Sequence, residues 1–256
     1  MVGALSVTAG GNNCVFIRPV FDLVTEVLNT KISPEAVEYA KLRAYSISDL
    51  YREKANKTEL LSVLIRFTPQ VILAYSHGTE NEIIGPDELS TIIDLGNTVW
   101  MNGKIVVLNA CLCGKRLAQA LVDAGASAVF AYNDELMIRV WSDTYDPLEG
   151  FKECINKPQV IFDGLKAKDV YDITIEEYNK WIEYWDEKDP TTADVLRHDR
   201  DNFALYGSGE SRITFSIYLL IGLTDIFIIT YAVLWTILMI LKETKFLWKK
   251  KEEIIL

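Results

Sequence analysis

The sequence predicts an α/β fold in which helices cover both faces of a mostly parallel sheet. Three short runs, VILAY (71–75), KIVVLN (104–109) and SAVFAY (127–132), are apolar along nearly their whole length instead of at alternate positions. Strands of this kind are buried on both faces, which is typical of parallel sheets. Segments with helical spacing separate them, and this alternation favours a three-layer sandwich.

Each further element has its own local signal. The apolar run CVFIRPV (14–20) predicts a first strand, and FDLVTEVLN (21–29) has helical spacing. Residues 34–55 predict a helix or a helix-turn-helix, with Pro34 at the first helical position. The remaining predictions are helices over 57–67, 86–95, 114–125, 146–157 and 174–189, and a last strand within 201–209.

The C-terminal part of the chain has a different composition. Residues 215–241 read FSIYLLIGLTDIFIITYAVLWTILMIL and carry one charged side chain, Asp225. About 20 apolar residues are enough to cross the core of a bilayer. The sequence therefore predicts an N-terminal domain over 1–211 and a C-terminal part, 212–256, that holds a single-pass transmembrane helix and a short basic tail.

Two signals disagree about the orientation of this helix. Five lysines follow it, and the positive-inside rule would place them in the cytoplasm and the domain outside. The N-terminus, however, has no secretory signal, and free cysteines suit a reducing compartment. We expect the domain on the cytoplasmic side. Asp225 either pairs with another chain, faces a polar path or is protonated, or else the span starts later and Asp225 lies at the interface.

Composition excludes several functions. The formal net charge is −10, so nucleic acid is not an expected partner. Four cysteines in a chain of this size do not make a disulfide scaffold. The pair Cys111 and Cys113 lacks the spacing of a zinc site. We expect no metal and no cofactor, and a protein or peptide as the partner.

A histidine and a cysteine stand at the ends of two predicted neighbouring strands. His77 follows VILAY and Cys111 follows KIVVLN. The carboxyl ends of parallel strands meet at one edge of the sheet, where active groups of α/β proteins lie. An imidazole beside a thiol takes its proton, or holds the thiolate as an ion pair, and later protonates the leaving amine. The pair is a candidate catalytic dyad.

A nucleophile that attacks a carbonyl also needs hydrogen-bond donors for the oxyanion that forms. The backbone N–H groups of Gly78 and Cys111 are the expected donors, and glycine permits close approach of a substrate to the backbone. Cys113 is expected to pack in the core and His198 to be solvated. Histidine precedes cysteine, and no glycine lies two positions before Cys111, which excludes the nucleophile elbow of the glutamine amidotransferases.

These motifs resemble the caspase-like cysteine peptidases, which have the caspase–hemoglobinase fold. The resemblance rests on VILAYSHGTENEIIG (71–85) and on IVVLNACLCGKRLAQALVDAGASAVFAYND (105–134), and FALYGS (203–208) resembles the closing strand. It is closest to the branch that contains the CHAT domains and gingipains. The resemblance implies a caspase-like sandwich and a cysteine endopeptidase in which His77 and Cys111 are catalytic.

The sequence also departs from the caspase pattern. Asn109 stands where caspases have glutamine, and Cys111 follows His77 by 34 positions instead of about 50. By analogy with the positions used in caspases, Asn109 and Arg18 are candidate substrate-binding residues. The main alternative to a membrane-anchored peptidase is a catalytically silent caspase-like or flavodoxin-like domain that acts as a membrane-tethered adaptor or sensor. A membrane-inserting effector is a third possibility.

Overall fold

The computed structural model describes residues 12–141 and 145–213, together with residues 231 and 235. The chain divides into two compact units, Met1–Phe215 and Ser216–Leu256. Within the described ranges, no helix is both long and apolar enough to cross a membrane. The predicted span over 215–241 lies outside these ranges, apart from Tyr231 and Trp235, and so does the basic tail. The membrane helix and the boundary at 211 stay predictions.

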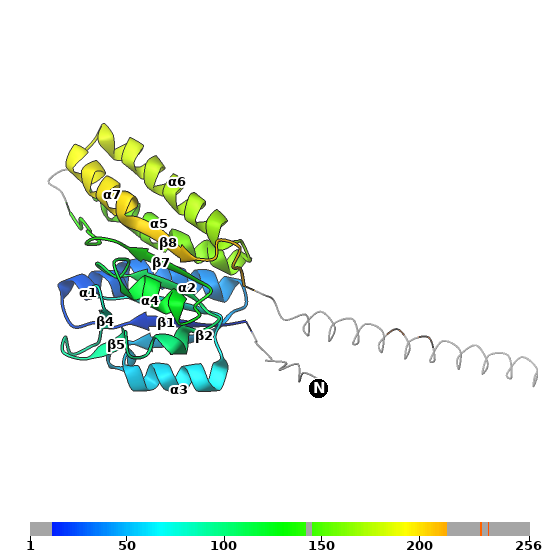
Figure 1. Cartoon of the computed structure of the whole chain (residues 1–256). Helices are drawn as coiled ribbons and strands as arrows, with labels where there is room; N and C mark the ends of the chain where they lie inside the picture. The colour runs from blue at the N-terminus through cyan, green and yellow to red at the C-terminus, as the bar shows by residue number, and fades with distance from the viewer. Residues whose placement is uncertain (1–11, 142–144, 214–230, 232–234, 236–256) are drawn as a thin grey trace, which may run out of the picture. The chain divides into compact units, whose positions relative to one another are not determined.

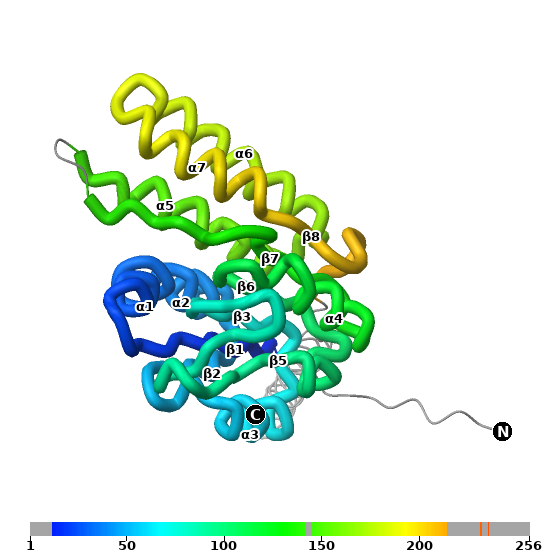
Figure 2. The backbone as a smooth tube through the Cα atoms, turned by 60° about the vertical axis from the view of Figure 1, so that its left-hand side comes forward, coloured from blue at the N-terminus to red at the C-terminus, as the bar shows by residue number. Residues whose placement is uncertain are grey.

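The N-terminal unit is built on a six-stranded sheet (Figure 1) with the strand order β2-β1-β3-β6-β7-β8, which can be followed in Figure 2. Every neighbouring pair is parallel except the last, in which β8 runs antiparallel to β7. The strands are β1 (Asn13–Arg18), β2 (Ser46–Tyr51), β3 (Val71–Tyr75), β6 (Ile105–Asn109), β7 (Ala128–Tyr132) and β8 (Phe203–Gly207). The mostly parallel α/β sheet predicted from the sequence is confirmed.

Helices cover both faces of this sheet. They are α1 (Leu23–Val27), α2 (Ser33–Leu42), α3 (Lys57–Phe67), α4 (Leu117–Asp123), α5 (Leu148–Asn156), α6 (Ala167–Asp186) and α7 (Pro190–Asn202). Figures 1 and 2 show α6 and α7 on one side of the sheet and α3 on the other.

Side chains of the central strands alternate between two cores. Phe16, Leu73 and Val107 point to the face covered by α2, α5, α6 and α7. Ile72 and Val106 point to the opposite face, which α3, α4 and the small antiparallel sheet of β4 (Glu82–Ile84) and β5 (Thr91–Asp94) cover. A strand that supplies both cores has to be apolar throughout, which explains the uninterrupted runs in the sequence.

Two predicted helices are wrong in part. The helix predicted over 34–55 ends at Leu42, because Ala44 adopts a left-handed conformation (φ 58°), and the chain continues as edge strand β2. The helix predicted over 86–95 is instead a turn followed by strand β5. The turn forms because the Asp87 carboxylate accepts hydrogen bonds from the N–H groups of Leu89 and Ser90.

Helix α7 was missed, although its start has a clear signal. Asp189 caps the helix by accepting a hydrogen bond from the N–H of Thr192, and Pro190 occupies the first turn. The segment is so polar that its hydrophobic spacing is weak. Only the cap marks it.

A π-helical turn, η1 (Leu28–Ile32), joins α1 to α2 and turns Asn29 into the protein. The Asn29 side chain is 1% exposed, and its amide donates hydrogen bonds to the carbonyl oxygens of Pro19 (2.6 Å) and Tyr75 (2.9 Å). Its own oxygen accepts from Ser33. Asn29 therefore ties together the chain just after β1 and the last residue of β3.

We expect Asn29→Ala to lower the free energy of unfolding by about 1–3 kcal/mol, because two buried carbonyl groups lose their donor. Thr30→Ala is the matched control: Thr30 is exposed, and within the described ranges its hydroxyl bonds only to the carbonyl of Glu26 on α1. The control should change stability by less than about 0.5 kcal/mol. Chemical denaturation of the full chain measures both, and equal losses would contradict the role given to Asn29.

Candidate active site

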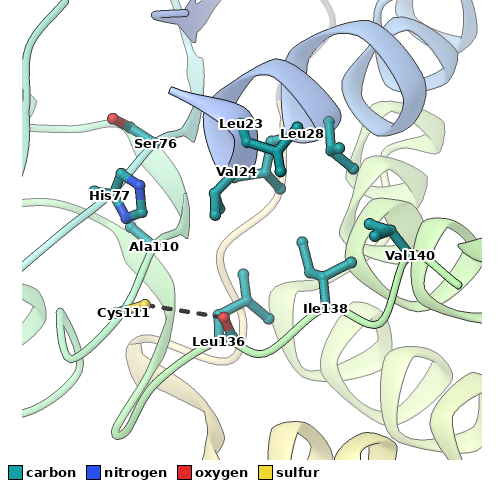
Figure 3. Close-up of a pocket in the computed structure, with 11 residues that line it drawn as sticks. Leu23, Val24, Leu28, Ser76, His77, Ala110, Cys111, Leu136, Ile138 and Val140 are labelled. Atoms are coloured by element: carbon teal, nitrogen blue, oxygen red, sulfur yellow. Dashed lines mark hydrogen bonds between the residues drawn. The ribbon is translucent and has the colours of Figure 1, made fainter. Parts of the chain in front are cut away.

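His77 and Cys111 lie at the same edge of the sheet. Strands β3 and β6 are adjacent and parallel, with Tyr75 in register with Asn109, so each candidate residue follows its strand by two positions. Both side chains line one cavity with a volume of about 240 Å³ (Figure 3). The parallel pairing of these two strands places the candidate residues together as expected.

Cys111 opens a sharp turn. The next residue, Leu112, has a left-handed backbone (φ 62°), and its N–H donates to the carbonyl of Asp134. A bulky residue in this conformation costs about 1–3 kcal/mol and is most often found at functional sites. The Cys111 thiol is partly buried and points to the carbonyl oxygen of Leu136, with the sulfur 3.9 Å away (Figure 3).

The protonation of Cys111 follows from this environment. Burial is the main cause that raises the pKa of the Cys111 thiol, because a thiolate would lose its hydration there, and the nearby carboxylate of Glu135 acts in the same direction. Within the described residues, no hydrogen bond or ion pair joins the thiol to the His77 ring. The site as it stands holds a neutral thiol.

The partner of His77 is Asp22. The imidazole Nε2 lies 2.7 Å from the Asp22 carboxylate, and the ring also packs against Phe21, with 5.7 Å between ring centroids. Burial alone would raise the pKa of Asp22, but hydrogen bonds from Thr25 and from His77 outweigh it and lower the pKa. Asp22 is therefore an anion that orients the ring.

Asp22 was not among the candidate residues predicted from the sequence. It is the N-cap of α1, where its side chain accepts from the N–H of Thr25 and Thr25 bonds back to the Asp22 backbone. The motif D-x-x-T just after a strand marks this cap in the sequence. Nothing in it indicates that the carboxylate also meets a histidine 55 positions later.

Gly78 lies against the Cys111 turn. A Cβ atom at this position would lie 2.6 Å from the Cys113 sulfur and 2.9 Å from the Cys111 carbonyl oxygen, so only glycine fits. Among the described residues, the backbone N–H groups of Gly78 and Cys111 donate no hydrogen bond to another residue. Of the two residues, Cys111 lines the cavity and Gly78 does not.

The structure does not bring Asn109 or Arg18 to the cavity. Asn109 is fully buried and is not a lining residue. The Arg18 guanidinium forms a bidentate ion pair with Asp49 (2.8 and 2.6 Å) and donates to Ser33 at a separate surface depression. Neither side chain is free to contact a molecule bound beside Cys111, because one is enclosed and the other is committed to a carboxylate.

The two remaining candidates have structural partners. Cys113 is completely buried in the core beneath the turn, as expected. His198, which was expected to be solvated, is partly exposed, and its Nε2 lies 3.0 Å from the carbonyl oxygen of Glu135. In the part of the chain that the structure describes, no cluster of three or more His, Cys, Asp or Glu side chains could hold a metal ion.

The fold is that of the caspase-like cysteine peptidases. The chain is similar in structure to the Arg-specific cysteine proteinase gingipain R (RgpB), with a TM-score of 0.57 and 11% identical residues over 80% of this chain. It is also similar to a chain in the complex of the pro- and mature domains of Porphyromonas gingivalis RgpB, with a TM-score of 0.55 and 11% identity over 80% of this chain. No protein-family model and no curated protein sequence matches.

The matches cover 48% and 49% of the two gingipain chains, so this chain corresponds to about half of each. At this level of identity the similarity concerns the fold. The resemblance to gingipain-like peptidases that the sequence predicted is therefore confirmed for the architecture, and the chemistry has to be argued from the site.

The raised pKa of Cys111 predicts how the free thiol reacts with iodoacetamide. Since only the thiolate reacts, labelling of the full chain should be slow at pH 7 and should rise with pH, with a midpoint above the ordinary thiol pKa of about 8.5. Mass spectrometry of labelled peptides separates Cys111 from the buried Cys14, Cys113 and Cys154, which serve as internal controls. A midpoint below neutral pH would show a preformed thiolate and contradict the neutral thiol.

Proposed function

We propose that the protein is a cysteine endopeptidase anchored to a membrane, with His77 and Cys111 as its catalytic dyad. One observation carries the proposal. The two side chains line the same apolar cavity at the ends of adjacent parallel strands. The shared fold with gingipain R, whose name describes a cysteine proteinase, supports the same chemistry.

The first half of the reaction forms an acyl-enzyme. His77 removes the thiol proton as the Cys111 sulfur attacks the carbonyl carbon of the scissile peptide bond. The negative charge that develops on the carbonyl oxygen is stabilised by the unused N–H groups of Gly78 and Cys111. The imidazolium then gives its proton to the leaving amine, the C–N bond breaks, and the acyl group remains on the sulfur.

Hydrolysis of the acyl-enzyme completes the cycle. His77 takes a proton from a water molecule that attacks the thioester, and returns it to the departing sulfur. Asp22 acts through His77: it fixes the ring orientation and stabilises the imidazolium that forms twice in each cycle. While each tetrahedral intermediate exists, the transferred proton is on His77, and the resulting imidazolium lies beside the Asp22 carboxylate.

The resting site requires a small rearrangement before this reaction. The sulfur is directed to the Leu136 carbonyl and the imidazole to Asp22, so the dyad is not yet hydrogen-bonded. Rotation of the Cys111 side chain brings the sulfur away from Leu136, and a bound peptide that fills the cavity would favour this rotamer. Catalytic hydrogen bonds are often long or absent before substrate binds.

A catalytically silent adaptor or sensor is the second candidate function. The raised pKa of Cys111 and the absence of a His77–Cys111 hydrogen bond in the described site favour it. Such a protein would use the same cavity to hold a peptide without cleaving it. The two functions differ only in what happens to the bound peptide.

The dyad is tested by single and double substitutions. Cys111→Ala should abolish peptide cleavage, and His77→Ala should lower kcat/KM by about 10²–10⁴-fold because the general base is lost. The double variant should be no worse than Cys111→Ala, since the two groups act as one unit. Kinetics with a peptide library under reducing conditions measures each effect.

Cys113→Ala is the matched control, because Cys113 is a thiol two residues away that lies in the core and outside the cavity lining. It should retain most of the activity. Cleavage that survives Cys111→Ala would refute the dyad. An intact wild-type chain that binds peptides but cleaves none would favour the adaptor.

The membrane anchor is proposed from the sequence of residues 215–241. We propose the cytoplasmic side for the domain because its free cysteines suit a reducing compartment. Asp225 is then available to pair with a second chain within the bilayer. In sealed, right-side-out vesicles, an added protease should spare the domain and should digest it only after detergent is added. Digestion in intact vesicles would show that the domain lies on the opposite side of the membrane. Recovery of the full chain without detergent would contradict the membrane anchor.

A further inference from the structure

The cavity beside Cys111 has two apolar walls that come from distant parts of the chain. One wall is the exposed face of α1 and the start of η1, and the other is the extended segment 134–140, which we call the strap (Figure 3). The walls consist of Leu23, Val24, Val27, Leu28, Leu136, Ile138 and Val140. The catalytic side contributes Ser76, His77, Ala110 and Cys111.

The strap is held in place by α7. Its alternate residues point in opposite directions, as in any extended chain. Leu136, Ile138 and Val140 line the cavity, whereas the backbone N–H of Met137 donates to Asp199 (3.0 Å) and Arg139 bonds to Asp189 and Thr192 (both 2.8 Å).

At the beginning of the strap, the ring of His198 meets the Glu135 carbonyl. The apolar wall is thus anchored through His198, Asp199 and Asp189, all on α7 or its cap. A wall that is fixed before binding can select among side chains by shape and polarity.

The cavity offers nothing to a charged side chain. Within the described residues, His77 is the only ionisable group of the lining besides Cys111 itself. Asp22 lies outside the lining and is already paired with His77. Glu135, whose charge acts on the Cys111 thiol, is exposed and also lies outside the lining. Asp199, behind the strap, is fully buried, and burial raises the pKa of its carboxyl well above the ordinary range, which favours the uncharged form. A guanidinium, ammonium or carboxylate in the cavity would lose its hydration without gaining a partner.

We infer that this cavity is the specificity pocket of the site and that it takes one large uncharged apolar side chain, of the leucine, methionine or phenylalanine type. In a substrate, this side chain belongs to the residue whose carbonyl Cys111 attacks, so the assignment rests on the proposed function. The volume is suitable: an apolar cavity of about 150 Å³ holds a benzene ring, and this one measures about 240 Å³.

The inferred preference differs from that stated in the name of the structurally similar protein, which is Arg-specific. An arginine side chain requires an acceptor for its donors, and a carboxylate is the usual one. The described lining supplies no carboxylate. The same fold with an apolar pocket therefore selects a different class of peptide.

The first experiment compares cleavage of peptides that differ only in the residue before the scissile bond. The full chain should cleave after Leu, Met or Phe with a kcat/KM at least about tenfold higher than after Arg, Lys or Asp. Ile138→Asp, which places a carboxylate in the strap wall, should reverse the order in favour of Arg. Ile65→Asp is the matched control, because Ile65 lies on α3 with 72% exposure and outside the lining; it should keep the wild-type order.

The second experiment does not require catalysis or the Ile138 variant. The Cys111→Ala full chain is titrated with N-acetylated peptides that end in Leu, Phe, Arg or Asp amides, and binding is followed by NMR shifts of the strap residues. Peptides ending in Leu and Phe should bind at least about tenfold more tightly.

The two failures are distinguishable. Preferential binding of apolar peptides by a chain that cleaves none would support the pocket and refute the peptidase. Cleavage or binding that favours Arg, Lys or Asp in the wild-type chain would overturn the pocket assignment and leave the peptidase intact. A chain that neither binds nor cleaves any of the peptides overturns both.

Discussion

The parallel pairing of β3 with β6 is the constraint on which the site depends. Their register places Tyr75 opposite Asn109, so the segments that follow β3 and β6 leave the sheet side by side. Gly78 then passes so close to the Cys111 turn that no side chain fits between them. Among the described residues, the backbone N–H groups of Gly78 and Cys111 donate no hydrogen bond to another residue. A slip of the register by one residue would send His77 to the opposite face of the sheet from Cys111.

The local signals explain why much of this site could be predicted from the sequence. Uninterrupted apolar runs define buried parallel strands, and residues that follow adjacent strands must meet, so His77 and Cys111 were recognisable together. Contacts between distant segments have no such signal. Asp22 reads only as a helix cap. Nothing in the strap over 134–140 indicates that α7 holds it, because the partners Asp199 and Asp189 lie 62 and 50 positions after Met137 and Arg139. Arg18 looked free because its partner, Asp49, lies on a strand that the sequence predicts as helix.

The arrangement separates two tasks that a cysteine peptidase combines. Asp22 orients the imidazole, whereas the Cys111 thiol is partly buried and neutral. In a reducing compartment a protonated, partly buried thiol is also protected from oxidation, because the thiolate is the form that oxidants attack.

The π-helical turn η1 has a consequence for how this site can change during evolution. A π-turn holds one residue more than the α-helical turn it replaces, and here the extra residue lets Asn29 reach two strand ends while α1 keeps its apolar face on the cavity. Loss of one residue within 28–32 would rotate α1 by about 100° relative to α2. That single deletion would turn Leu23 and Val24 away from the cavity. It would also carry the Asp22 carboxylate away from His77. The segment is therefore expected to tolerate substitutions more readily than changes in length.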